Sequence, residues 1–154
     1  MASVAPSQES MAWTAGILEL SGTKSGVSEL VGLRAARHDD FDRVVFEFRG
    51  ARPGARLEYV DRPVRRCGSG EPTEIAGDGW LSVRFEPAAA HTEEGVATIA
   101  PRERKLDLPI VREIELTCDF EAMVTVVLGT AKPNRFRVLE LDAPPRIVVD
   151  VRHR

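Results

Sequence analysis

Acidic side chains recur in close pairs along this chain of 154 residues, and carboxylate pairs are groups that can perform acid–base chemistry. Glu113 and Glu115 stand two residues apart in an alternating apolar–polar run, which places both carboxylates on one face of a strand. A glycosidase holds its two carboxyl groups roughly 5–9.5 Å apart across a cleft. The sequence gives no sign of a cleft, so we expect these two glutamates to lie on a solvated strand face.

Other residue types that could do chemistry are not arranged for it. Residues 67–70 contain Ser69 but lack the Gly-x-Ser-x-Gly spacing of a nucleophile loop. The three histidines (His38, His91 and His153) stand far apart, and neither cysteine belongs to a CxxC pair. The sequence therefore predicts no catalytic site, no metal site and no cofactor.

Two cysteines are present, Cys67 and Cys118. They are either two buried thiols or one disulfide that closes a loop of about 50 residues. By the chain-entropy relation, closing such a loop stabilises the fold by roughly 4 kcal/mol. We expect the bond if the protein is extracytoplasmic, because disulfides persist in oxidising compartments.

The elements that must position these residues are short strands. In residues 42–49, Val44, Phe46 and Phe48 share one face, and the charged side chains mostly take the other. Turn residues separate this run from the next. The pattern predicts an all-β domain, either an antiparallel β-sandwich or a small closed barrel, of about eight strands. The predicted strands cover residues 29–36, 42–49, 55–60, 80–86, 110–118, 123–128, 135–141 and 146–151.

Two connections between these strands are distinctive. Residues 38–42 (HDDFD) form a tight acidic connection, for which we favour an Asx-type turn over a cation or sugar-hydroxyl site. The connection over residues 87–109 is long for a compact domain, and residues 87–94 could form one short helix within it.

Length and charge bound the possible functions. The length fits one domain, with residues 1–27 expected to be a mobile N-terminal segment and residues 28–154 to form the β domain. A net charge of −3 argues against binding of nucleic acid, and no apolar run is long enough for membrane insertion. Residues 1–24 lack the basic and apolar regions of a signal peptide. We therefore expect either a cytoplasmic protein or an extracytoplasmic one whose leader has been removed.

Two stretches carry a resemblance to a known family. FDRVVF (residues 41–46) and PPRIVVD (residues 144–150) resemble the AMIN-like domain, a relative of the AMIN module of bacterial cell-envelope proteins. The resemblance extends over residues 29–151. It implies a β-sandwich in an extracytoplasmic protein, often a lipoprotein or a secreted protein, and a targeting role exerted by binding peptidoglycan.

The resemblance also selects candidate binding residues. Arg43, Arg146 and Asp150 lie opposite apolar neighbours on their strands, where they either contact a ligand or form ion pairs that fix strand register. Arginines on a sheet face would pair with the peptide carboxylates of peptidoglycan or of an envelope protein. We expect a non-catalytic binding or targeting module. The alternatives are a small β-barrel that carries an apolar ligand and an enzyme that uses a carboxylate pair.

Overall fold

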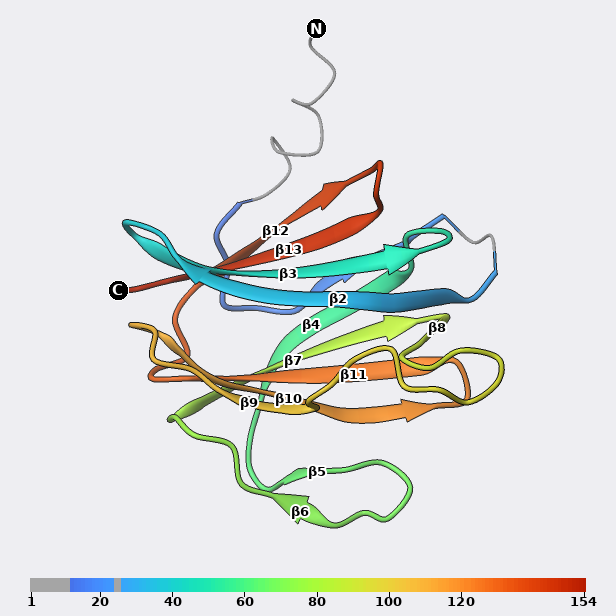
Figure 1. Ribbon diagram of the computed structural model, residues 1–154. Coiled ribbons are helices and arrows are strands. Elements are labelled where there is room, and N and C mark those ends of the chain that lie inside the picture. Colours follow the sequence, from blue (N-terminus) through green and yellow to red (C-terminus); the bar gives the residue numbers. More distant parts are fainter. Residues whose placement is uncertain (1–11, 24–25) are drawn as a thin grey trace, which may run out of the picture.

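The computed structural model describes residues 12–23 and 26–154, which form two sheets packed face to face and a small hairpin (Figure 1). The five-stranded sheet has the order β12 (Phe136–Leu141), β13 (Arg146–Arg152), β3 (Phe41–Arg49), β2 (Ser28–Arg37), β8 (Ala88–Ala89). The six-stranded sheet has the order β1 (Leu18–Leu20), β4 (Gly54–Val60), β7 (Gly79–Glu86), β11 (Met123–Thr130), β10 (Val111–Phe120), β9 (Glu103–Lys105). Residues 61–78 contain a small hairpin, β5 (Val64–Arg65) and β6 (Pro72–Thr73), and this whole segment, called the β5–β6 hairpin, lies below the six-stranded sheet in Figure 1.

The prediction of an antiparallel β-sandwich is confirmed, and each of the eight predicted strands is present. The barrel alternative is wrong, because neither sheet closes on itself. The short helix considered for residues 87–94 is also wrong, since that stretch contains β8, which pairs in parallel with β2. Of the expected N-terminal segment, residues 1–11 and 24–25 lie outside the described residues, whereas residues 18–20 form β1 against β4.

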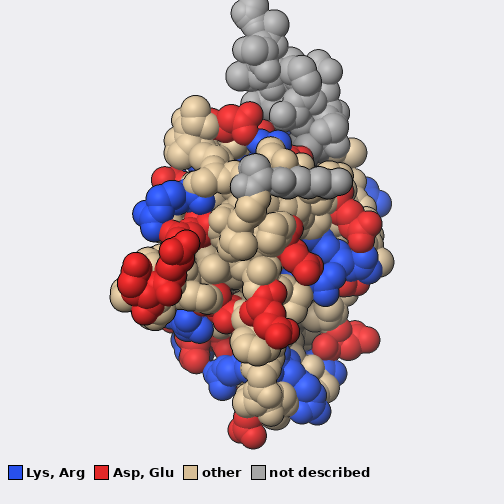
Figure 2. Space-filling view, turned by 90° about the vertical axis from the view of Figure 1, so that its right-hand side faces the viewer, with Lys and Arg blue, Asp and Glu red and all other residues tan. Residues whose placement is uncertain are grey.

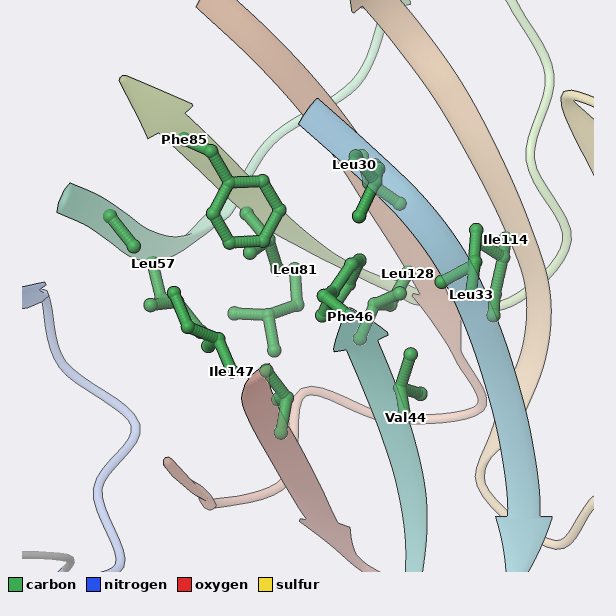
Figure 3. Packing of buried hydrophobic residues seen from close by; sticks show 14 of the residues in the cluster. Leu30, Leu33, Val44, Phe46, Leu57, Leu81, Phe85, Ile114, Leu128 and Ile147 are labelled. Atoms are coloured by element: carbon green, nitrogen blue, oxygen red, sulfur yellow. The ribbon is translucent and has the colours of Figure 1, made fainter. Parts of the chain in front are cut away.

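The core lies between the two sheets and is built from the inward set of each alternating strand. Phe46 and Phe48 of β3 meet Phe85 of β7 edge to face, with ring centroids 4.9 and 5.0 Å apart. Aliphatic side chains from both sheets fill the space around these rings (Figure 3). Edge-to-face rings add a directional contribution to the area that they bury, so this cluster fixes how the sheets face each other.

One buried carboxylate ties the two sheets together at the end where β3 begins. Asp42 is fully buried, and its Oδ2 accepts hydrogen bonds from the backbone N–H groups of Ile110 and Val111 at 2.8 and 2.9 Å. Its Oδ1 lies 2.9 Å from Nε2 of His153, which follows the last strand. The acidic stretch 38–42 is therefore divided between two roles: a backbone hydrogen bond closes the turn from His38 to Phe41, and Asp42 belongs to the interior.

A bulge in β10 redirects its C-terminal half. The pairing with β11 shifts between Leu116 and Cys118, so Leu116 faces Val126 whereas Cys118 faces Thr125. Val126 belongs to the core, and the neighbouring residue of the strand points to the opposite face. Strict alternation would place Leu116 and Cys118 on one face. The bulge instead turns Cys118 to the outer face, where the β5–β6 hairpin lies.

Candidate functional site

Three neighbouring strands bring a buried carboxylate and two arginines together on the outer face of the five-stranded sheet. Asp150 of β13 is in register with Arg43 of β3 and with Arg137 of β12. Arg43 donates from Nε to Asp150 Oδ1 at 2.8 Å and from Nη2 to Oδ2 at 3.0 Å. Arg137 Nε donates to Oδ2 at 2.9 Å. Because Asp150 is fully buried, these charge-assisted hydrogen bonds offset the cost of desolvating its charge.

Two aromatic rings pack against these arginines. The guanidinium carbon of Arg137 lies 4.6 Å from the centroid of the Trp13 ring and 5.0 Å from that of Phe41. The Arg152 guanidinium lies 5.3 Å from the Trp13 ring, and that of Arg43 lies 5.4 Å from Phe41. These distances fit cation–π contacts. We call this surface the arginine–aromatic face; it consists of Trp13, Phe41, Arg43, Arg137, Asp150 and Arg152.

Trp13 reaches this face because the chain beside it joins the edge of the sheet. The backbone N–H of Thr14 donates to the carbonyl of Phe136 at 2.9 Å, and the N–H of Phe136 donates back at 2.8 Å. This two-bond bridge fixes the chain along the outer edge of β12. Trp13 itself is only partly buried.

The arginine–aromatic face carries a surplus of positive charge. Its three guanidinium groups face one carboxylate, which leaves two positive charges. The hydrogen bond to Asp150 raises the pKa of Arg43 above its usual value, so this side chain stays charged. Arg152 forms no ion pair with any residue in the described ranges. This guanidinium can therefore pair with an external carboxylate without breaking an ion pair.

Arg146, the third predicted binding residue, does not join this cluster. Arg146 lies on β13 four residues before Asp150, and its register partner on β3 is Glu47. Its guanidinium donates from Nε to the carbonyl of Pro144 at 3.1 Å. The structure thus brings Arg43 and Asp150 together and leaves Arg146 further along the same outer face.

Elsewhere on the surface, arginines pair with carboxylates across neighbouring strands. Arg34 of β2 lies 3.1 Å from Glu47 of β3 on the five-stranded sheet, and Arg56 of β4 pairs with Glu19 of β1 on the other. Basic and acidic side chains are also interspersed over the side of the molecule seen in Figure 2. Exposed pairs of this kind contribute about 0–1 kcal/mol each and fix register more than they add stability.

The expectation that Glu113 and Glu115 lie on a solvated face is wrong. Both are buried, with exposures of 2% and 1%, because the β5–β6 hairpin covers this part of β10. Glu115 accepts hydrogen bonds from Arg66 Nε at 3.0 Å and from Thr73 Oγ1 at 2.8 Å. Glu113 accepts from the backbone N–H of Ala76 at 2.9 Å. These carboxylates anchor the hairpin through donors that it supplies.

The hairpin is also attached covalently. Cys67 and Cys118 form a disulfide with Cα atoms 5.1 Å apart and a sequence separation of 51.

Ser69, next to the disulfide, accepts a hydrogen bond from the backbone N–H of Glu71 at 3.1 Å, as in a turn. The histidines of the described region contact other residues: His91 Nδ1 lies 2.8 Å from Asp119, His153 Nε2 lies 2.9 Å from Asp42, and the His38 ring stacks on Phe41. None of them bonds Ser69 within the described ranges.

Sequence reasoning missed four residues of the arginine–aromatic face: Phe41, and the three residues Trp13, Arg137 and Arg152. Arg137 and Arg152 lie opposite the core-facing residues of their strands, and this alternation was the available signal for them. Trp13 lies in the segment expected to be mobile, and nothing in its neighbourhood predicts the bridge to β12. The partnership of all three with Asp150 and Phe41 depends on strand pairing between distant segments.

Fold and site together define a small two-sheet β domain with a cation-rich, aromatic sheet face. The sequence matches the AMIN-like domain over residues 28–153, and the chain belongs to this family. No curated protein and no solved structure matches it. The family suggests a cell-envelope module outside the cytoplasm, and its members are generally non-catalytic binding or targeting modules. Within the described residues, no helix is long and apolar enough to cross a membrane.

Proposed function

We propose that this chain is a non-catalytic binding module of the bacterial cell envelope and that its arginine–aromatic face binds peptidoglycan. Peptidoglycan combines amino-sugar rings with peptides that carry free carboxylates. A guanidinium matches a carboxylate through two parallel hydrogen bonds. A flat, partly exposed indole offers a surface for the apolar side of a sugar ring.

The observation that carries the proposal is the unbalanced charge beside Trp13. Arg152 lies 5.3 Å from the ring and lacks an ion-pair partner among residues 12–23 and 26–154. Arg43 and Arg137 are about one third exposed beside it while sharing Asp150. A carboxylate that binds here gains a charge-assisted contact next to an aromatic surface. Arg146, further along β13, would extend the same surface toward a longer polymer.

Two further observations support the proposal. The Cys67–Cys118 disulfide is typical of proteins in oxidising compartments, which include the bacterial envelope. The paired carboxylates Glu113 and Glu115 accept hydrogen bonds from Arg66, Thr73 and Ala76, so neither is poised for acid–base catalysis at an open cleft.

Co-sedimentation with purified peptidoglycan sacculi at low salt tests this function. Arg152→Ala removes a guanidinium that holds no ion pair, and we expect it to weaken binding about tenfold, the equivalent of about 1.4 kcal/mol. Arg84→Ala is the matched control, because Arg84 is exposed on β7 of the opposite sheet and also lacks an ion pair within the described chain. Failure of the unmodified protein to sediment with sacculi would refute the proposal. Equal loss in both variants would refute the assignment of the face.

A further inference from the structure

The two cysteines of the disulfide differ sharply in their exposure. Cys118 lies within β10 and is 5% exposed, whereas Cys67 is exposed at the start of the turn between β5 and β6. Gly68 and Gly70 in this turn adopt positive φ, and a Cβ added at either would meet no atom within 4 Å. Cys67 also lines a surface pocket of about 330 Å³. A small thiol can therefore approach Cys67 from solvent, whereas the strand shields Cys118.

We propose that the Cys67–Cys118 disulfide is a site of thiol–disulfide exchange entered at Cys67, and that its reduction opens the β5–β6 hairpin while the sandwich stays folded. The reaction partner is a dithiol, either a small molecule or a protein.

The exchange proceeds in two balanced steps. A thiolate of the dithiol attacks Cys67 Sγ, forms a mixed disulfide with it and expels Cys118 as a thiolate, which takes up a proton. The second thiolate of the dithiol then attacks the other sulfur of the same dithiol, which is bonded to Cys67 in the mixed disulfide, and releases Cys67 as a thiolate. The protein disulfide gains two electrons and the dithiol is oxidised to a cyclic or internal disulfide. Attack at Cys67 is favoured over attack at Cys118 because access decides which sulfur reacts.

The hairpin is built to separate from the sandwich once this bond is broken. Among the residues that the structure describes, its strands pair only with each other and share no ladder with the six-stranded sheet. Its apolar contact with the sheet is a small cluster in which Val64 and Ile75 meet Val127, with the partly buried Val60 and Trp80 packed against them. Its polar contacts are hydrogen bonds to the buried carboxylates of Glu113 and Glu115. Further hydrogen bonds join it to Thr117, Thr130, Glu103 and Trp80.

The hydrogen bonds to the two carboxylates add little net stability to the closed hairpin without the covalent link. Opening returns two buried carboxylates to water, and their regained hydration offsets much of the lost hydrogen bonding. The core between the two sheets includes no residue of the hairpin strands, so it remains intact when the hairpin leaves. Local opening of this kind is expected where few buried apolar contacts hold a segment.

The first test locates the sulfur that is attacked. The folded protein is treated briefly with 2-mercaptoethanol, quenched with acid and mapped by mass spectrometry. We expect the mixed disulfide on Cys67 in at least tenfold excess over Cys118. Equal labelling, preference for Cys118, or no reaction under native conditions would overturn the proposal.

The second test measures what reduction releases. Backbone hydrogen exchange is compared with and without dithiothreitol. We expect residues 61–78 to exchange at least tenfold faster after reduction while β11 keeps its protection. Unchanged protection of residues 61–78 would show that contacts alone hold the hairpin, and loss of protection in β11 would show that reduction unfolds the domain; either result overturns the proposal.

A double variant controls for direct effects of the reductant. Cys67→Ser combined with Cys118→Ser should exchange over residues 61–78 like the reduced protein, whether or not dithiothreitol is present. Slow exchange in this variant, equal to that of the oxidised protein, would contradict the proposed role of the bond. If the variant does not fold, the comparison of oxidised and reduced natural protein decides alone.

Discussion

Asp42 offers the sharpest test of how the two sheets are held together. Its Oδ2 accepts both backbone N–H groups at the start of β10, and its Oδ1 faces His153. Asp42→Ala leaves two buried N–H groups without an acceptor, each costing about 1–3 kcal/mol. We therefore expect the free energy of unfolding to fall by about 4 kcal/mol. Asp42→Asn keeps an oxygen for both N–H groups and presents its amide to His153, so the expected loss is only about 1 kcal/mol.

Urea denaturation followed by circular dichroism measures these differences. Glu47→Ala is the control, because Glu47 lies on the same strand in an exposed pair with Arg34 that contributes about 0–1 kcal/mol. A loss of less than about 1 kcal/mol in Asp42→Ala would refute the inter-sheet role, because it would mean that the N–H groups need no carboxylate. An equal loss in Asp42→Asn would show that the charge, rather than the oxygen, stabilises the fold.

Three further predictions concern single features of the fold. Burial raises the pKa of Tyr59, the only tyrosine, to about 12. The free energy of unfolding should therefore keep its full value below pH 10, the ordinary pKa of tyrosine, and fall as pH rises toward 12. The absorbance of tyrosinate in folded and urea-unfolded protein checks this, and coincident titrations of the two would contradict it. Replacing Cys67 and Cys118 by serine should lower the free energy of unfolding by up to about 4 kcal/mol in urea denaturation, and an unchanged midpoint and slope would contradict the loop-closure argument. Gly129→Ala places a Cβ 2.1 Å from the Ala76 carbonyl oxygen, so the melting temperature should drop by several degrees, and an unchanged value would contradict the close approach of the hairpin.

The long strands were predictable from the sequence because alternation over six or more residues identifies a sheet face. Residues 42–49 and 146–151 alternate clearly, and both strands pair along their length. Strands of two or three residues could not be found in this way. β5, β6 and β8 are too short to show a period, and their pairing depends on segments that lie elsewhere in the chain.

The environment of a strand face was not predictable, since it depends on what covers that face. The alternation of Glu113 and Glu115 is the pattern of a solvated strand, but a hairpin from residues 61–78 supplies donors and excludes water. The bulge before Cys118 likewise reverses the expected direction of its side chain. In both cases tertiary contacts between distant segments override the local pattern.

For the candidate site, the outward direction of some side chains could be predicted from the sequence, but the contacts between them could not, because these depend on strand pairing. Arg43 and Asp150 follow from alternation as outward residues, but their pairing requires the register of β3 against β13. That register also separates Arg146 from them. The contribution of Trp13 depends on a bridge between the N-terminal segment and β12.

The two tryptophans of the chain allow the most direct test of the proposed binding face. Trp13 lies on the arginine–aromatic face, whereas Trp80 lies on the opposite sheet beside the hairpin, where its indole N–H donates to Ile75. Their indole N–H signals can be followed by nuclear magnetic resonance during titration with soluble peptidoglycan fragments. We predict a progressive shift of the Trp13 signal and a constant Trp80 signal. A shift of Trp80 alone, or no shift of either signal at saturating fragment, would contradict binding at this face.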